Sequence, residues 1–247
     1  MRLHGKTALI TGGNTGIGRG VALTYAREGA DVAFTWLKAP EAAESLADEI
    51  KALGRRALAL PCDVTDEAQV LATFATVQQA WGRLDVLVVN AGIQRPQPIL
   101  AMSVADWDTM MQVHLRGAFL CTREAARLMM AQGHGRIVTV CSQLGYIGRS
   151  DYTAYSTAKG GLLAFTRALA KELAPHGVLV NGVSPGLVDT GFDPLSVEAK
   201  AAHAASLPLQ RLGTVDDMTS AFVFLASDEA RYYCGQMLHP NGGEIMP

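Results

Sequence analysis

Near its N-terminus the chain reads Thr7-Ala8-Leu9-Ile10-Thr11-Gly12-Gly13-Asn14-Thr15-Gly16-Ile17-Gly18. A short apolar run leads into a glycine turn, and a helical pattern over residues 17–27 follows the turn. In a parallel sheet such a turn lies at the carboxyl edge, where bare glycine backbone and helix N-terminal amides can accept a pyrophosphate. The spacing Gly-x-x-x-Gly-x-Gly departs from the commoner Gly-x-Gly-x-x-Gly, but its place between a strand and a helix is the one that a dinucleotide site requires.

The same alternation of apolar runs and helical patterns continues along the chain. Further strand-like runs cover residues 31–34, 57–60, 84–89, 137–140, 178–180 and 237–238. Further helical patterns cover residues 41–53 and 67–81. Near-continuous apolar strands separated by helices indicate a parallel sheet that is covered on both faces. The sequence therefore predicts one α/β domain over residues 1–247, a Rossmann-like doubly wound sheet, since no linker divides the chain.

Several helix ends carry recognisable capping residues. Thr65 stands before an acidic pair as an N-cap would, and Ser103 and Thr214 each precede an aspartate by three residues. Glycines follow helical patterns where a left-handed C-cap residue is favoured, at Gly29, Gly54, Gly82 and Gly177. These boundaries support the predicted alternation of strands and helices.

The composition excludes several classes of protein. Hydrophobic residues make up 49% of the 247 positions and charged residues 18%, which excludes disorder. The formal net charge of −2 gives no basic footprint, so we expect no nucleic-acid partner. No apolar run approaches the ~18 residues of a membrane span, and the N-terminus does not resemble a signal peptide. The scattered cysteines (Cys62, Cys121, Cys141 and Cys234) indicate reduced thiols in a cytoplasmic protein with no metal site.

The end of the second strand bears on the choice of dinucleotide. An acidic residue there would bind a ribose 2′-hydroxyl, whereas a basic one would accept a 2′-phosphate. The run ends Thr35-Trp36-Leu37-Lys38 without a carboxylate, and Asp31 lies too early in the strand to reach the ribose. Lys38 could meet a phosphate, although a single loop lysine is more often only solvated. The cofactor is expected to be NADP or NAD, with NADP slightly favoured.

A second group of polar residues follows the run over residues 137–140. Ser142 comes directly after this run, and Tyr155 and Lys159 are spaced to share one helix face. A free tyrosine titrates near ~10, and a neighbouring ammonium would lower its pKa toward neutrality. Such a tyrosine suits proton transfer to or from an alcohol oxygen. By itself, a tyrosine with a lysine one turn later is a common surface arrangement.

Taken in order, these motifs resemble the short-chain dehydrogenase/reductase family over nearly the whole chain. The segments that carry the resemblance are the turn with Gly12, Gly16, Ile17 and Gly18, then Asp63-Val64, Asn90-Ala91-Gly92, Ser142 with Tyr155-x-x-x-Lys159, and Pro185-Gly186 with Val188 and Thr190. The resemblance implies that these segments, together with Asn14, Thr15 and Lys38, bind a nicotinamide dinucleotide.

The resemblance also implies the reaction, a hydride transfer between nicotinamide C4 and a carbonyl or alcohol carbon. Tyr155 would be the general acid/base, and Ser142 would hydrogen-bond the substrate oxygen as charge develops. Lys159 would bind the nicotinamide ribose and keep the pKa of Tyr155 low. No metal is expected. Because the family is commonly tetrameric, the resemblance implies a homotetramer that packs through the regions near residues 106–130 and 152–174.

Two positions depart from the family pattern. His114 stands where the family commonly has an asparagine that organises water in a proton relay from the lysine. It could act in that relay through its ring nitrogens, leave the relay altered, or be a buried histidine satisfied by backbone. Val89 stands where a first asparagine often precedes Asn90, and we expect this change to be tolerated.

Substrate contacts are expected after Ser142, before Tyr155 and in a small substrate-loop region near residues 187–212. Gln143 and Arg149 indicate a small polar substrate, such as a sugar, a sugar acid or a polyol, although Arg149 could instead pair with Asp151. The 3-oxoacyl-carrier-protein reductases also resemble this chain and are the alternative. A non-catalytic dinucleotide sensor is a remote alternative, which the intact catalytic set opposes. The apolar C-terminal residues 242–247 are expected to dock on another subunit.

Overall fold

Seven parallel strands form one sheet through the centre of the molecule. In the computed structural model, which describes residues 1–247, the strands lie in the order β3-β2-β1-β4-β5-β6-β7. Their bounds are β1 (Thr7–Ile10), β2 (Asp31–Trp36), β3 (Ala57–Pro61), β4 (Val86–Val89), β5 (Gly135–Val140), β6 (Val178–Val183) and β7 (Met237–Leu238). The strand order reverses between β1 and β4, and ligands of such sheets bind at the carboxyl ends of the strands beside this reversal.

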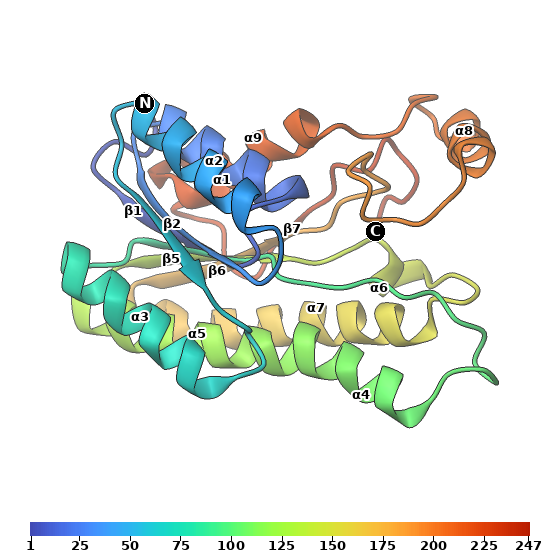
Figure 1. Cartoon of the computed structure of the whole chain (residues 1–247), viewed down its shortest axis with the longest axis horizontal. Coiled ribbons are helices and arrows are strands. Elements are labelled where there is room, and N and C mark those ends of the chain that lie inside the picture. Colours follow the sequence, from blue (N-terminus) through green and yellow to red (C-terminus); the bar gives the residue numbers. More distant parts are fainter.

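Helices cover both faces of the sheet (Figure 1). One face carries α1 (Gly16–Arg27), α2 (Pro40–Ala52) and α9 (Val215–Ala226), and the other carries α3 (Glu67–Trp81), α5 (Gly117–Gln132) and α7 (Thr153–Leu173). The shorter elements are α4 (Val104–Met111), the π-helix η1 (Gln112–Arg116), α6 (Leu144–Ile147), α8 (Val197–Ser206) and the 3-10 turns η2 (Ala174–His176) and η3 (Asp228–Ala230). None of the helices combines the length and the apolar character needed to cross a membrane.

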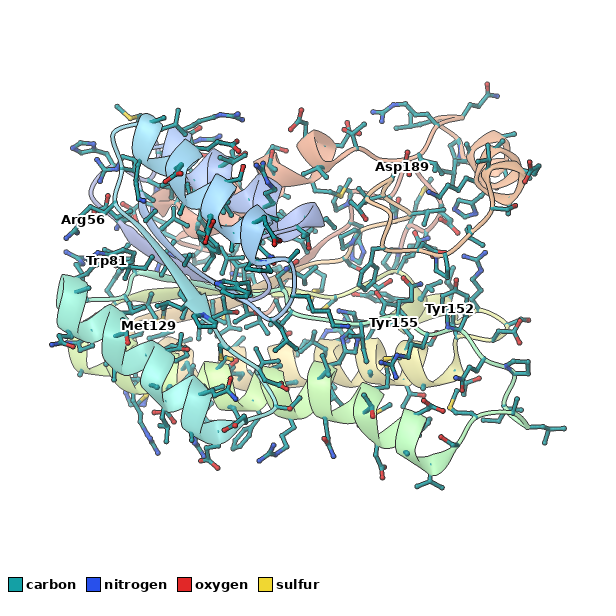
Figure 2. The ribbon with its side chains drawn as sticks, viewed as in Figure 1. Arg56, Trp81, Met129, Tyr152, Tyr155 and Asp189 are labelled. Atoms are coloured by element: carbon teal, nitrogen blue, oxygen red, sulfur yellow. The ribbon has the colours of Figure 1, made fainter.

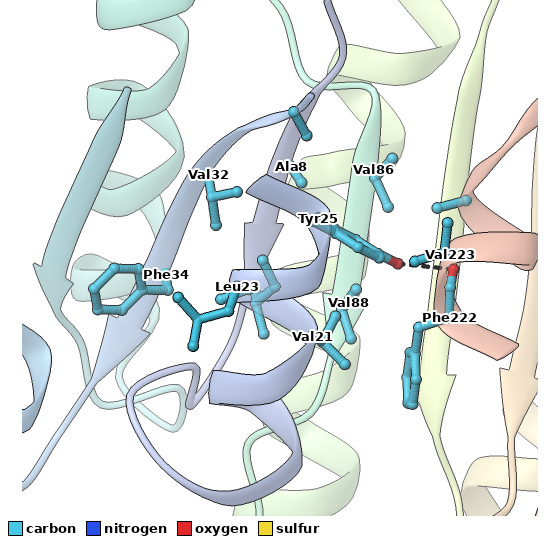
Figure 3. Packing of buried hydrophobic residues seen from close by; sticks show 14 of the residues in the cluster. Ala8, Val21, Leu23, Tyr25, Val32, Phe34, Val86, Val88, Phe222 and Val223 are labelled. Carbon is cyan, nitrogen blue, oxygen red and sulfur yellow. Dashed lines mark hydrogen bonds between the residues drawn. The ribbon is translucent and has the colours of Figure 1, made fainter. Parts of the chain in front are cut away.

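Two hydrophobic clusters hold the layers together. Alternate residues of a strand point to opposite faces of the sheet. In β1, Ala8 and Ile10 accordingly pack in the cluster under α1, α2 and α9, whereas Leu9 packs in the cluster under α3, α5 and α7. The hydroxyl of the buried Tyr25 donates a hydrogen bond to the Phe222 carbonyl at 3.0 Å and so links α1 to α9 (Figure 3). The predicted doubly wound fold is confirmed.

One predicted helix cap is wrong. The N-cap of α3 is Asp66, whose carboxylate accepts hydrogen bonds from the amides of Ala68 and Gln69. Thr65 lies one residue too early because its amide and hydroxyl both donate to the Asp63 carboxylate. The caps at Ser103 and Thr214 are confirmed, and Thr214 forms a full capping box with Asp217.

The segment between β6 and α9 leaves the sheet and returns to it. A parallel bridge pairs Val188 with Gly213, which closes the base of this excursion. Its helix, α8, has no buried residue and lies at the same end of the molecule as α6 and the C-terminus (Figure 1). Residues 189–212 therefore stand over the carboxyl edge of the sheet, where the predicted substrate-loop region falls.

Candidate active site

A cleft of about 750 Å³ opens at the carboxyl ends of the strands. It is lined by the β1–α1 turn, the ends of β2 to β6, the start of α7 and the segment that carries α8. The sequence-predicted residues that line it are Gly12, Asn14, Thr15, Gly16, Ile17, Lys38, Asp63, Val64, Asn90, Ala91, Gly92, His114, Ser142, Gln143, Arg149, Tyr155, Lys159, Pro185, Gly186, Val188 and Thr190. Gly18 alone among the predicted residues lies behind this surface.

The glycine turn between β1 and α1 fits an anionic pyrophosphate. Gly12 and Gly16 have φ values of +60° and +53°, which other residues rarely adopt. A Cβ at Gly18 would lie 2.5 Å from the Gly12 carbonyl oxygen, so this glycine allows α1 to start close under the turn. The N-cap Thr15 makes no side-chain capping bond, which leaves the first amides of α1 available to an anion.

Two side chains brace the turn rather than face a ligand. Asn14 donates from Nδ2 to the carbonyl oxygens of Lys38 and Ala39 at 2.7 and 3.2 Å, which ties the turn to the loop after β2. Asn90 donates from Nδ2 to the carbonyl oxygens of Thr11 and Gly12 at 2.9 and 2.8 Å. Both asparagines reach the cleft, but their amide hydrogens are already used to hold the turn in place.

The loop after β2 presents an unpaired ammonium at the end of the cleft where the family resemblance predicts the adenosine. Lys38 is exposed and lines the cleft beside Trp36 and Leu37. Of the four carboxylates of α2, Glu49 pairs with Arg19 and Asp48 with Lys51, and the other two form no ion pair. The Lys38 ammonium therefore has no ion pair within the chain and can meet an anionic group of a ligand.

Ser142, Tyr155 and Lys159 come together in the middle of the cleft. Tyr155 and Lys159 are 9% and 4% exposed, and Ser142 is 8% exposed. The Lys159 ammonium donates to the Val140 carbonyl oxygen at 2.7 Å and lies 5.6 Å from the centre of the Tyr155 ring. Figure 2 shows Tyr155 and its neighbour Tyr152 between α7 and the segment that carries Asp189. Strand β5 and helix α7 thus supply the three groups predicted for proton transfer.

Burial sets the protonation states of Tyr155 and Lys159. The sequence led us to expect a lowered pKa for Tyr155, and the structure gives the opposite direction. Burial raises the pKa of Tyr155 above its ordinary value, and the nearby Ser142 hydroxyl opposes that rise only in part. Burial also lowers the pKa of Lys159 to about 8. The Tyr155 hydroxyl therefore keeps its proton at neutral pH, while most of Lys159 stays charged.

His114 lies in η1, the π-helical turn that joins α4 to α5. Its ring is 2% exposed and meets the Tyr155 ring edge-on, with 5.4 Å between ring centres. Nε2 lies 2.8 Å from the Ile93 carbonyl oxygen, whereas Nδ1 is buried without a partner. Burial and the Lys159 charge lower the pKa of His114 to about 3, so the ring is neutral. If Nε2 donates to the Ile93 carbonyl, Nδ1 is an acceptor without a partner beside the Tyr155 ring.

The predicted substrate contact Arg149 is exposed at the rim of the cleft. Its guanidinium lies 5.0 Å from the centre of the Tyr152 ring and forms no ion pair with Asp151. The Tyr152 hydroxyl donates to the Asp193 carboxylate at 3.2 Å, and Gln94 Nε2 donates to its second oxygen at 3.1 Å. Asp193, which is 9% exposed, is therefore a buried acid in the substrate half of the cleft.

The C-terminal tail folds toward the cleft of its own chain, where Glu244 lines the wall, and the expectation that residues 242–247 dock on another subunit stays a prediction. The Glu244 carboxylate accepts hydrogen bonds from Gln143 Nε2 and from His203 Nε2, the latter at 3.1 Å. The Gly242 carbonyl also accepts from the Leu209 amide at 3.2 Å. No site role was predicted for Glu244 or His203. No local sequence pattern indicates that the C-terminal tail contacts α8.

Comparison with known proteins agrees with this geometry. A family model described as enoyl-(acyl carrier protein) reductase matches residues 12–244. A 3-oxoacyl-[acyl-carrier-protein] reductase FabG of Staphylococcus aureus is 39% identical over 242 residues, which are 98% of each chain. The FabG of Escherichia coli is 37% identical over 247 residues, which are 100% of each chain.

Solved structures show the same fold. A short-chain type dehydrogenase/reductase from Mycobacterium marinum superposes with a TM-score of 0.94 at 37% identity, covering 99% of this chain and 97% of that one. A putative gluconate dehydrogenase from Agrobacterium tumefaciens gives a TM-score of 0.94 at 32% identity, covering 99% and 98%. The fold, the motifs and the end-to-end similarity agree, and the chain belongs to the short-chain dehydrogenase/reductase family of oxidoreductases.

Proposed function

We propose that the protein reduces the 3-oxo group of an acyl thioester to a secondary alcohol, with NADPH as the hydride donor. The observation that carries this proposal is the similarity to 3-oxoacyl-carrier-protein reductases over 98–100% of both chains. The rim of the cleft supports it, because the exposed side chains of Ile147 and Phe192 line the cleft and would contact an acyl chain or a thioester arm.

Ser142, Tyr155 and Lys159 would each have a different role in the protonation of the carbonyl oxygen. When bound, the nicotinamide supplies the hydride that the carbonyl carbon accepts. The Ser142 hydroxyl would donate a hydrogen bond to the carbonyl oxygen, and the Tyr155 hydroxyl would transfer its proton to that oxygen. The Lys159 ammonium, 5.6 Å from the ring centre, would stabilise the resulting phenolate until solvent returns a proton. A tyrosine that is protonated at neutral pH supports the direction of carbonyl reduction.

The cofactor preference rests on the adenosine end of the cleft. Lys38 lines the cleft without an ion pair, and β2 ends at Trp36 without a carboxylate that would bind a ribose 2′-hydroxyl. These features support NADP(H) over NAD(H). The dinucleotide would lie along the glycine turn, Asp63-Val64, Asn90-Ala91-Gly92 and the segment from Pro185 to Thr190.

A hydroxylated substrate, such as a sugar or a polyol, is the second candidate. It is favoured by the polar groups in the substrate half of the cleft, where Gln143, Asp193 and Glu244 all present oxygen acceptors. Hydroxyl groups of a substrate could donate hydrogen bonds to these oxygens.

Initial rates with NADPH and NADH separate these candidates. The substrates are acetoacetyl-coenzyme A, neutral polyols and sugar acids, each assayed in the direction its oxidation state requires. We expect the highest kcat/KM for the thioester with NADPH. A higher kcat/KM for polyols would favour the second candidate, and NADPH binding without turnover of any compound would identify a dinucleotide sensor.

A further inference from the structure

One amide oxygen in the substrate half of the cleft has no partner. Gln143 is 4% exposed and lines the cleft next to Ser142, and its Oε1 atom is buried without a hydrogen bond. The orientation of this amide follows from chemistry, because Nε2 donates to the Glu244 carboxylate, which can only accept. Oε1 is therefore an unused acceptor beside the catalytic serine.

Two carboxylates line the same half of the cleft. Glu244 is held by Gln143 and His203, and its side chain is 20% exposed. Asp193 accepts hydrogen bonds from the Tyr152 hydroxyl, the Gln94 amide and the Leu195 backbone amide, and is 9% exposed. Each carboxylate has about four acceptor positions, more than these neutral or histidine donors fill. Both groups can therefore accept further hydrogen bonds from a ligand.

The cations of the cleft leave these carboxylates largely uncompensated. The Lys159 ammonium donates to the Val140 carbonyl and lies under Tyr155. Arg149 is exposed to solvent and stacks on Tyr152, and neither cation pairs with Asp193 or Glu244. Lys38 and Asp63 line the adenosine end instead. A substrate beside Ser142 and Tyr155 thus meets acceptors and negative charge.

We propose that Gln143, Asp193 and Glu244 form an acceptor subsite that favours neutral carbonyl substrates, binds an N–H or O–H donor where the substrate carries one, and rejects carboxylates. A carboxylate has no hydrogen to donate and is repelled by two fixed negative charges in a partly desolvated cleft, which is how interfaces exclude unwanted partners. The proposal rests on the proposed carbonyl reduction and deepens it, because an acyl thioester is neutral. It disfavours the sugar acids among the substrates expected from the sequence, since the Gln143 Nε2 group already donates to Glu244.

A matched pair of small ketones tests this subsite. Acetoacetamide and acetoacetate have the same size and the same ketone, but the first is neutral with N–H donors and the second is an anion. Dissociation constants are measured by calorimetry for the protein saturated with NADP⁺, and kcat/KM is measured with NADPH. We expect acetoacetamide to bind at least tenfold more tightly. Equal affinities, tighter binding of acetoacetate or binding of neither compound would overturn the proposal.

Isosteric variants locate the effect. Glu244→Gln and Asp193→Asn each remove one charge, and each should reduce the affinity ratio between amide and acid severalfold. Glu198→Gln removes one charge at the exposed start of α8 and should leave the ratio unchanged. A ratio that neither cleft variant reduces, or that Glu198→Gln reduces equally, contradicts the assignment. If acetoacetyl-coenzyme A is not reduced while the affinity ratio holds, the proposed thioester activity fails and the subsite stands.

Discussion

Lys38 is the residue on which the proposed NADPH preference depends. Its ammonium lines the cleft without an ion pair, so a 2′-phosphate would gain a charge-assisted hydrogen bond there. We expect Lys38→Ala to lower kcat/KM for NADPH by about tenfold and to leave kcat/KM for NADH nearly unchanged, since such bonds contribute about 1.5 kcal/mol or more. Initial rates with both cofactors measure this change.

A second exposed lysine provides the matched control for Lys38. Lys51→Ala removes the same charge at the far end of α2, where the ammonium pairs with Asp48 at 3.1 Å. This variant should alter neither cofactor's kinetics. An equal loss of kcat/KM with NADPH and NADH in Lys38→Ala would show that Lys38 does not bind the 2′-phosphate.

His114 should make the protein sensitive to acid. Burial lowers its folded pKa to about 3, whereas an unfolded histidine titrates near ~6.5. Below about pH 6.5 the unfolded chain therefore takes up a proton that the folded chain refuses, and stability falls by about 1.4 kcal/mol per pH unit until the folded pKa is reached. His114→Asn lacks this proton uptake, so we expect the difference in free energy of unfolding between wild type and variant to shrink or reverse between about pH 7 and pH 5.

Urea denaturation at several pH values measures this difference. A difference that stays constant over the range would mean that His114 is not held neutral in the folded protein. The same variant also tests the ring in catalysis, because an asparagine cannot reproduce the edge-on contact that His114 makes with Tyr155.

At the scale of the element, the turn from β1 into α1 was predictable and the joint between α4 and α5 was not. The glycines of the turn predict positive φ angles, and Gly12 and Gly16 adopt them. The sequence of Gln112–Arg116 does not predict a π-helix, because its composition is ordinary for an α-helix. The bulge is a tertiary feature, since the His114 ring packs so closely on Gly92 that a Cβ there would lie 2.6 Å from Cε1.

Gly18 tests the turn as a unit. A Cβ at this position would lie 2.5 Å from the Gly12 carbonyl oxygen and 2.6 Å from Asn90 Nδ2, so the turn would have to shift. We expect Gly18→Ala to raise the KM for NADPH at least tenfold, with a smaller effect on thermal stability. As a control, Gly160→Ala places its Cβ 3.4 Å from the nearest atom and should leave that KM unchanged. An unaltered KM in Gly18→Ala would contradict the role of the turn.

At the scale of the whole molecule, sequence patterns predicted the layers but not the closure of the cleft. Apolar periodicity and glycines report which segments are strands, helices and turns. The contacts of Asp193 with Gln94 and of Glu244 with Gln143 join residues about a hundred positions apart, and no local pattern encodes such pairs. The burial that raises the Tyr155 pKa is likewise a property of the assembled fold.

We propose that the protein is a homotetramer, as the family resemblance implies. Large apolar side chains remain exposed along and before α4 and α5, at Leu100 in the loop before α4, at Val104 in α4, and at Phe119 and Met130 in α5. Light scattering at micromolar concentration should give about four times the chain mass of 26.2 kDa. Phe119→Glu should shift the protein to smaller species, whereas Leu71→Glu on α3 should not. A wild-type monomer would contradict the proposal.

The central claim is that the Tyr155 hydroxyl transfers the proton to the substrate oxygen while the dinucleotide is held elsewhere. Tyr155→Phe removes only that hydroxyl from a ring that is 9% exposed. The direct measurement is NADPH-dependent turnover of acetoacetyl-coenzyme A together with the dissociation constant for NADPH. We expect turnover to fall by about 10²–10⁴-fold, the usual contribution of a general acid, with the NADPH affinity nearly unchanged. Turnover close to that of the wild type in a variant that still binds NADPH would contradict the mechanism.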